Sequence, residues 1–167
     1  MPLRITLLRH AKSSQDYIGA NDFFRPLNKR GEEESRLMGK LLKKKKYKPE
    51  VIFSSKAERT KITAKNFAEE LGLKSKYIHL KEDMYLASAQ SLLNMSIKIS
   101  ANYKNIMLVG HNPGITDFIN LVSDAQIQNL PTCGIVSILL KSNEWRDLLQ
   151  PNSEIDWSLC PKKDLVT

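Results

Sequence analysis

The sequence lacks the features that mark several classes of protein. Only two of its 167 residues are cysteines, Cys133 and Cys160, and they form no Cys-x-x-Cys pattern, so a structural zinc site is not predicted. The apolar runs are short and interrupted, which predicts neither a signal peptide nor a transmembrane helix. The low cysteine content fits a reducing compartment, and we expect a cytoplasmic protein. With 41% apolar and 26% charged residues, the composition is typical of one globular domain over residues 1–167.

Positive charge is present in excess and is unevenly distributed. The formal net charge is +8, and residues 1–50 hold 13 of the 26 lysines and arginines but only 6 of the 18 acidic residues. Six of the nine residues from Lys40 to Lys48, here named the lysine cluster, are lysine. The cluster fits the solvated C-terminal end of a helix, where cations interact favourably with the helix dipole. Binding of nucleic acid or of an acidic protein surface is the less favoured alternative.

Strand-like and helix-like segments alternate along the chain. The patterns predict strands over 3–8, 51–53, 77–80, 105–109, 134–141 and 144–150, and helices over 31–45, 57–71, 87–103 and 115–122. Strands separated by helices indicate an α/β fold, and we expect one three-layer α/β/α domain with a mostly parallel sheet and an antiparallel edge hairpin. Residues 12–30 are expected to form an extended loop. The tail after Pro151 is expected to be irregular, with Trp157 holding it to the body.

Four basic side chains follow predicted strands. Arg9 and His10 come at the end of the first strand, Arg59 follows the second, and His111 follows the strand over 105–109. Open α/β sheets bind ligands outside the carboxyl ends of their strands, so these side chains can share one crevice. Taken singly, each of them is more often an ordinary structural or surface residue. Their joint occurrence at one sheet edge is what favours a functional site.

These residue types suit the transfer of a phosphoryl group. Two guanidiniums can offer paired donors to the charged equatorial oxygens of the transition state. Arginines also disfavour protonation of a neighbouring histidine, and a neutral imidazole is the nucleophilic form. His10 is thus a candidate nucleophile, and His111 is a candidate hydrogen-bond partner for a transferring oxygen. A helix that starts after Pro113 would add its positive end.

Three blocks of the sequence carry a family resemblance. Leu-Arg-His-Ala-Lys-Ser-Ser (8–14), the segment 54–64 and Val-Gly-His-Asn-Pro-Gly (109–114) resemble the histidine phosphatase superfamily in order and spacing. Arg-Pro-Leu (25–27), shortly before Arg-Gly (30–31), is similar to the small SixA-type phosphohistidine phosphatases. The resemblance runs from about residue 3 to 140 and implies the phosphoglycerate-mutase-like fold.

The resemblance also implies roles for individual residues. His10 would be the phosphorylated nucleophile, and a phosphate pocket would be completed by Arg9, Arg59, His111, Ser13, Arg25 and Asn112. Asn112 stands where the acid phosphatase branch carries an aspartate, so the phosphoglycerate-mutase-like branch fits better. Ala11 replaces a glycine that many members have. The general acid is left open among Glu82, Asp83 and Asp16, and the alternative interpretation of these carboxylates is surface solvation.

We therefore predict a phosphatase that needs neither metal nor cofactor and that acts on protein phosphohistidine. The P–N bond is labile and needs little help from an acid, and a short chain leaves an open pocket for a protein substrate. The alternatives are a phosphatase for small phosphomonoesters and a non-catalytic module that binds phosphate or nucleic acid. The expected partners are a phosphorylated protein or a small phosphate compound, with no membrane partner, nucleic acid disfavoured, and a monomer or weak dimer as the assembly.

Overall fold

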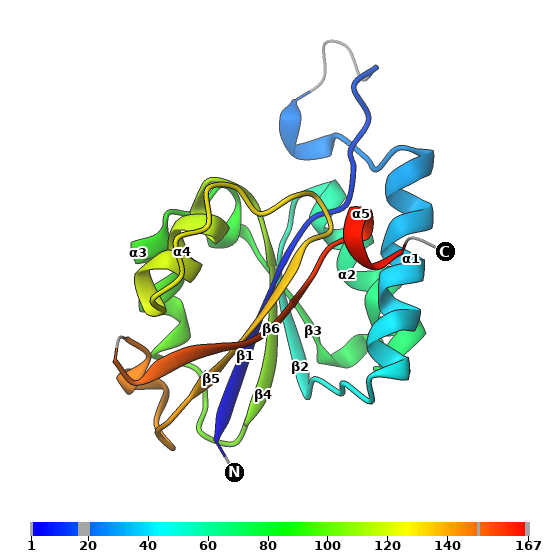
Figure 1. Ribbon diagram of the computed structural model, residues 1–167. Helices are drawn as coiled ribbons and strands as arrows, with labels where there is room; N and C mark the ends of the chain where they lie inside the picture. Colours follow the sequence, from blue (N-terminus) through cyan, green and yellow to red (C-terminus); the bar gives the residue numbers. More distant parts are fainter. Residues whose placement is uncertain (1, 17–20, 150, 166–167) are drawn as a thin grey trace.

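The computed structural model describes residues 2–16, 21–149 and 151–165 (Figure 1). Within this part of the chain, six strands form one sheet in the order β3-β2-β4-β1-β5-β6. The strands are β1 (Leu3–Arg9), β2 (Val51–Ser55), β3 (Ile78–Lys81), β4 (Asn105–Gly110), β5 (Ile135–Leu140) and β6 (Ser153–Leu159). The first four are mutually parallel, whereas β5 and β6 run antiparallel to their neighbours. The predicted mostly parallel sheet with an antiparallel edge is confirmed.

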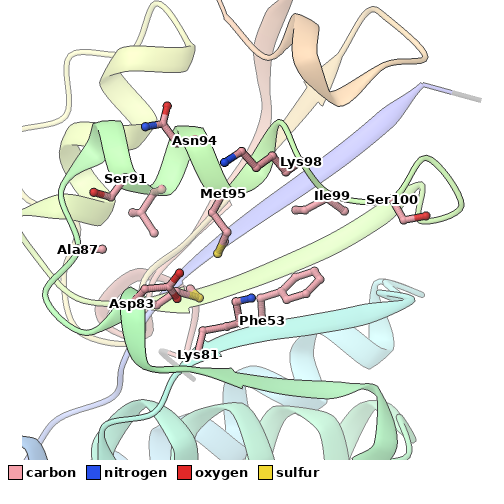
Figure 2. Close-up of a pocket in the computed structure, with 12 residues that line it drawn as sticks. Phe53, Lys81, Asp83, Ala87, Ser91, Asn94, Met95, Lys98, Ile99 and Ser100 are labelled. Atoms are coloured by element: carbon pink, nitrogen blue, oxygen red, sulfur yellow. The ribbon is translucent and has the colours of Figure 1, made fainter.

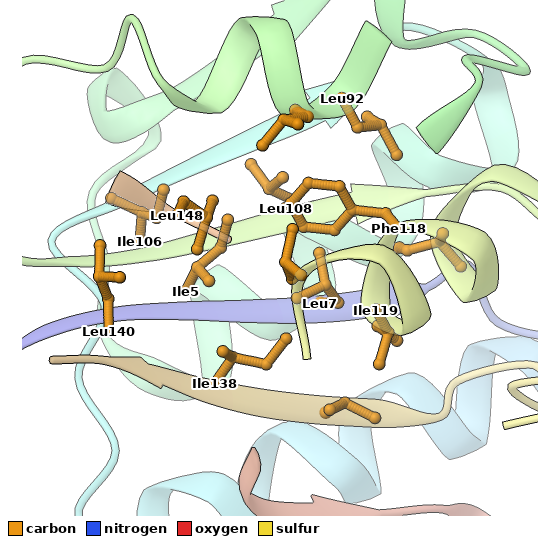
Figure 3. Close-up of a cluster of buried hydrophobic side chains, with 14 of the residues drawn as sticks. Ile5, Leu7, Leu92, Ile106, Leu108, Phe118, Ile119, Ile138, Leu140 and Leu148 are labelled. Atoms are coloured by element: carbon orange, nitrogen blue, oxygen red, sulfur yellow. The ribbon is translucent and has the colours of Figure 1, made fainter. Parts of the chain in front are cut away.

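Helices cover both faces of the sheet, as Figure 1 shows. They are α1 (Lys29–Lys44), α2 (Glu58–Leu71), α3 (Ala89–Ser96), α4 (Gly114–Val122) and the short α5 (Pro161–Asp164). Successive side chains of a strand point to opposite faces, so each buried strand serves two apolar clusters. Leu7 packs with Leu108 and Phe118 under α3 and α4 (Figure 3), whereas Leu8 packs with Phe67 under α1 and α2. The predicted three-layer arrangement is confirmed.

The helix ends follow local chemistry. The Asn28 side chain accepts a hydrogen bond from the Gly31 amide at 2.8 Å and so caps the start of α1. A Cβ on Gly31 would lie 2.0 Å from the Lys12 carbonyl oxygen, so only glycine lets α1 approach the chain that follows β1. At the C-terminal end of α2, Gly72 adopts a left-handed φ of 72° and terminates the helix.

The structure corrects three of the predicted elements. The helix predicted over 87–103 ends at Ser96, whose hydroxyl donates to the Leu92 carbonyl at 2.7 Å and competes with helical bonding. No strand forms over 144–149, where Trp145–Asp147 is a single 3-10 turn. The edge strand is instead β6, which lies in the tail predicted to be irregular. Its sequence alternates exposed polar and partly buried residues, as expected at a sheet edge.

Two further expectations concern the loop after β1 and the tail. Residues 17–20 of the predicted loop over 12–30 lie outside the described residues; the rest of it contains a short 3-10 helix, η1 (Asp22–Phe24), and the first residues of α1. Trp157 does contact the body of the domain: its ring lies edge-on to buried Tyr47, with the centroids 5.7 Å apart.

The lysine cluster occupies the C-terminal end of α1 and the turn that follows. All six of its lysines are exposed, whereas Tyr47 between them is buried. Lys43 and Lys44 lie in the last turn of α1, where cations interact favourably with the helix dipole. Among the residues that the structure describes, no helix is long and apolar enough to cross a membrane.

Candidate active site

A pocket of about 420 Å³ lies where β1, β2 and β4 end. This strand-end pocket is lined by Arg9, His10, Lys12, Ser13, Gln15, Asp22, Arg25, Arg59, Leu86, His111, Asn112 and Thr132. All seven residues that the sequence assigned to a phosphate pocket are among them. The reason is topological, because parallel strands bring the loops at their carboxyl ends to the same sheet edge.

His10 sits at the tip of β1, with 6% of its surface exposed. Its Nδ1 donates a hydrogen bond to the Ala11 carbonyl oxygen at 2.8 Å. Because a carbonyl oxygen can only accept, Nδ1 carries the proton of the neutral ring and Nε2 keeps its lone pair. Burial, with smaller contributions from Arg59, Arg9 and Arg25, lowers the pKa of His10 to about 4. The imidazole is therefore neutral and nucleophilic at neutral pH.

The backbone around His10 is fixed by bonds from three other elements. The His10 amide donates to the Gly110 carbonyl of β4 at 3.1 Å, and the Cys133 amide donates to the His10 carbonyl at 3.0 Å. The Ala11 amide donates to Thr63 Oγ1 of α2 at 3.0 Å. These bonds hold the nucleophile candidate in one position relative to the other strand ends.

Two arginines, one buried and one half-buried, bring positive charge to the strand-end pocket. Arg59 lies in the first turn of α2 and is 2% exposed; its Nη1 and Nη2 donate to the Asp22 carbonyl and carboxylate oxygens at 2.8 and 2.9 Å. Arg9 Nη1 donates to the Leu130 carbonyl oxygen at 2.9 Å. The Nε atoms of both arginines are buried and have no partner among the described residues. A buried donor without an acceptor is costly, so these two N–H groups indicate a place for a bound oxyanion.

His111 adds a second buried imidazole to the strand-end pocket. It is 3% exposed, and its ring centroid lies 5.5 Å from that of His10. Its Nε2 is 2.7 Å from Ser55 Oγ, while its Nδ1 is buried without a partner in the described part of the chain. Burial and then Arg59 lower the pKa of His111 to about 3, so the ring is neutral. If the Ser55 hydroxyl donates to Nε2, Nδ1–H is free to donate to an oxyanion.

Asp22 is a residue of the pocket that the sequence analysis missed. Its carboxylate accepts hydrogen bonds from Tyr85 Oη at 2.6 Å, Arg25 Nη2 at 2.8 Å and Arg59 Nη2 at 2.9 Å. Burial alone would raise the pKa of Asp22, but the bonds from Tyr85, Arg25 and Arg59 together hold it well below its usual range. The only sequence signal was an aspartate three residues before Arg25, a spacing that allows the two side chains to pair.

The remaining predicted binding residues tie the pocket loops together. Ser13 accepts a hydrogen bond from Arg25. Asn112 donates to the Leu130 carbonyl at 3.0 Å and accepts from Thr116 Oγ1 at 2.7 Å. Both therefore support neighbouring groups of the pocket while they line it.

None of the three predicted general-acid candidates lines the strand-end pocket. Glu82 is exposed and pairs with Lys56 at 3.2 Å. Asp83 lines a different cavity. Asp16 is exposed, and its backbone N–H donates a hydrogen bond to Ser14 Oγ at 3.3 Å. The chain turns at η3 (Glu82–Met84) directly after β3, which leaves the carboxylates of Glu82 and Asp83 exposed outside the strand-end pocket. The prediction that Glu82, Asp83 or Asp16 acts as the general acid therefore gains no support from the structure.

Comparisons with known proteins agree with this geometry. Residues 5–85 match the model of the histidine phosphatase superfamily (branch 1). An uncharacterised chloroplastic protein of Arabidopsis thaliana is 30% identical over 164 residues, which cover 93% of this chain and 75% of that one. The phosphohistidine phosphatase SixA of Agrobacterium tumefaciens is similar with a TM-score of 0.79 and 27% identity over 96% of this chain and 99% of that one.

A SixA structure in complex with tungstate shares the fold, with a TM-score of 0.77 and 20% identity over 96% of this chain and 98% of that one. The sequence match, the fold, and the two histidines and two arginines that line one pocket point to one conclusion. The chain belongs to the histidine phosphatase superfamily, branch 1.

Proposed function

We propose that the protein hydrolyses protein phosphohistidine through a covalent phosphoryl group on His10. Membership of the superfamily supports phosphatase activity in general. The observation that carries the finer proposal is the state of His10, a buried, neutral imidazole whose Nε2 is free. It lines the same pocket as Arg9 and Arg59, each with a buried N–H group that has no acceptor in the described part of the chain.

The proposed reaction has two steps. The substrate imidazole first takes up a proton from solvent; the lone pair of His10 Nε2 then forms a bond to phosphorus while the bond from phosphorus to the substrate nitrogen breaks, and the neutral imidazole departs. Arg9, Arg59 and the Nδ1–H of His111 donate to the phosphoryl oxygens as their charge builds up. A water oxygen then attacks phosphorus, the bond to His10 breaks, and inorganic phosphate leaves.

The charges of the pocket support catalysis without a metal. Two guanidiniums supply the positive charge and the paired donors that a transferring phosphoryl group requires. We expect full activity to remain after treatment with a chelator. Loss of activity on chelation, with recovery on addition of a divalent cation, would contradict this part of the proposal.

The choice of phosphohistidine rests on the missing acid. Among the described residues, the carboxyl group that lines the pocket is that of Asp22, which is held ionised and so cannot donate a proton at neutral pH. An alkoxide leaving group would need such a proton, whereas an imidazole of the substrate can be protonated before its bond to phosphorus breaks. The pocket therefore suits a P–N bond better than the P–O bond of an alkyl phosphate.

The test is a comparison of kcat/KM for three substrates: a phosphohistidine peptide, the matching phosphoserine peptide and a small sugar phosphate. His10→Ala serves as the blank for each. We expect phosphohistidine to be preferred by more than about tenfold, because the leaving group differs in its need for an acid. A preference of that size for the sugar phosphate would replace the proposal with a phosphatase for small phosphomonoesters.

A further inference from the structure

A second cavity, larger than the strand-end pocket, lies between α3 and the strands β2 and β3. Its volume is about 530 Å³, within the range of about 300–1,000 Å³ typical of small-molecule sites. It exists because α3 is short and the chain after Ser96 leaves part of β2 and β3 uncovered. Figure 2 shows Met95 pointing from α3 toward the sheet, with Phe53 on the opposite wall. We name it the α3 cavity.

The α3 cavity has an apolar interior and a charged rim. Its apolar lining comes from Phe53, Met84, Ala87, Leu92, Met95 and Ile99. Its rim carries Lys81 and Lys98, neither of which forms an ion pair with any residue that the structure describes. Lys56 nearby, in contrast, is paired with Glu82. Two unpaired cations beside an aromatic ring and a thioether can hold an anionic group next to a flat apolar body.

A third charged residue on the rim, Asp83, limits the kind of anion. Asp83 shares the rim with the two lysines and forms no ion pair with any described residue. Its carboxylate repels an anion of high charge, so a single carboxylate or sulfonate group fits the rim better than a polyphosphate.

One short segment forms a wall of both cavities. Met84 and Ala87 line the α3 cavity, whereas Leu86 between them lines the strand-end pocket. Tyr85 of the same segment donates to Asp22, which in turn holds Arg59. Leu86 has a φ of 50°, a conformation that residues other than glycine rarely adopt. A group in the α3 cavity would contact Met84 and Ala87, which flank the Tyr85 that donates to Asp22.

We propose that the α3 cavity binds a small organic anion with an aromatic body, and that its occupancy changes the affinity of the strand-end pocket for phosphate. The aromatic body lies against Phe53 and Met95, and the anionic group contacts Lys81 and Lys98. The proposal goes beyond the phosphatase activity proposed above, and its binding test does not depend on turnover.

The experiment uses the full chain and anilinonaphthalene sulfonate, an aromatic monoanion. The isotope-labelled methyl groups of methionine are followed by NMR, because Met84 and Met95 line the cavity whereas Met38 and Met107 lie in the cluster under α1 and α2. We expect the Met84 and Met95 signals to shift with one saturable constant while those of Met38 and Met107 stay in place. Equal shifts at all four positions, or none, would overturn the proposal.

Two variants and one control test the chemistry of the cavity. Lys98→Glu should weaken binding about three- to tenfold, the range expected for the charge reversal of an exposed group. Lys74→Glu makes the same charge change at an exposed lysine outside the cavity and should leave binding unchanged. Ser91→Phe adds volume at the cavity wall and should also weaken binding. Equal binding by Lys98→Glu and Lys74→Glu would show that the rim does not hold the anion.

The link to the strand-end pocket is tested with inorganic phosphate. Its dissociation constant is measured by titration with and without saturating anilinonaphthalene sulfonate. We expect a change of at least about fivefold, the lower end of typical coupling between two sites, and no change in the Ser91→Phe variant. An unchanged constant in the wild type would overturn the link, whatever the phosphatase assays show.

Discussion

The two ends of the parallel strands are both positively charged, yet they differ in how the charge is held. At the carboxyl ends, Arg9 and Arg59 each have an Nε–H that is buried without an acceptor in the described structure, next to two neutral histidines. At the opposite end, the lysines of the lysine cluster are exposed, and none of them forms an ion pair within the described part of the chain. The first arrangement leaves buried donors without an acceptor among the described residues, whereas the second exposes its charges to solvent.

The number of charged residues in a segment is therefore a poor guide to where the phosphate pocket lies. The lysine cluster is the densest run of charge in the sequence, with six of the 26 lysines and arginines, but an exposed ammonium gains little from one more partner in water. The Nε–H groups of Arg9 and Arg59 are already buried, so a phosphoryl group would satisfy donors that no described residue satisfies.

His10→Ala should reduce phosphatase activity by on the order of 10⁴-fold or more, because it removes the atom that accepts the phosphoryl group. Circular dichroism and the urea midpoint should show that the variant still folds. Activity within tenfold of the wild type, in a folded variant, would mean that another group is the nucleophile.

Arg59→Lys should lower kcat/KM about 10²- to 10³-fold, because an ammonium cannot present the paired donors of a guanidinium to a phosphoryl group. The matched control is Arg36→Lys, at an exposed arginine that pairs with Glu69 at 3.1 Å. Steady-state kinetics of the two variants side by side separate the buried from the exposed arginine. Equally small losses of kcat/KM in the two variants would show that Arg59 contributes no more to catalysis than Arg36 does.

The burial of His10 should make the fold sensitive to acid. Its pKa is about 4 in the folded state against an ordinary value of 6.5, so the unfolded chain takes up a proton first as the pH falls. Stability is unaffected above pH 6.5 and is lost between 6.5 and about 4, by about 2 kcal/mol at pH 5 for this group.

His10→Asn, which cannot be protonated, should therefore lose less stability between pH 7 and pH 5 than the wild type does. Urea unfolding at the two pH values measures the difference. An identical loss in both proteins would show that His10 is protonated in the folded state at pH 5.

Asp22→Asn should tighten the binding of inorganic phosphate about three- to tenfold, because Asp22 holds Arg59 and repels a phosphate dianion from the pocket. Calorimetric titration gives the constant directly. Weaker binding in the variant would show instead that Asp22 is needed to hold Arg59 in place.

Replacement of Lys43, Lys44, Lys45 and Lys46 by glutamine should change kcat/KM for a small phosphate substrate by less than about twofold, since these exposed charges lie at the far end of α1 and are screened by salt. A loss as large as that of Arg59→Lys would make the lysine cluster part of the site. That result would favour the alternative of a module that binds phosphate or nucleic acid through the lysine cluster.

The sequence predicted the centre of the molecule better than its edges. The buried strands are continuous apolar runs, and the order of strands and helices places Arg9, His10, Arg59 and His111 at one sheet edge. The edge strand β6 was missed because its polar alternation resembles an irregular tail.

Asp22 was missed for a different reason. Its place in the strand-end pocket depends on how the loop after β1 folds back, which the pairing of Ser13 with Leu27 fixes in the structure. No local sequence pattern indicates that this loop folds back onto the pocket. The unsatisfied Nε atoms of Arg9 and Arg59 are likewise a property of packing, so they could not be inferred from residue types.

The central claim is that His10 itself carries the phosphoryl group, and trapping the intermediate tests it most directly. Wild type and His10→Ala are mixed with a phosphohistidine peptide, quenched within milliseconds in base and analysed by mass spectrometry. We predict one phosphoryl group on His10 that is stable in base and lost in acid, and none in His10→Ala. A phosphoryl group on another residue, or turnover by the wild type with none on His10, would contradict the account.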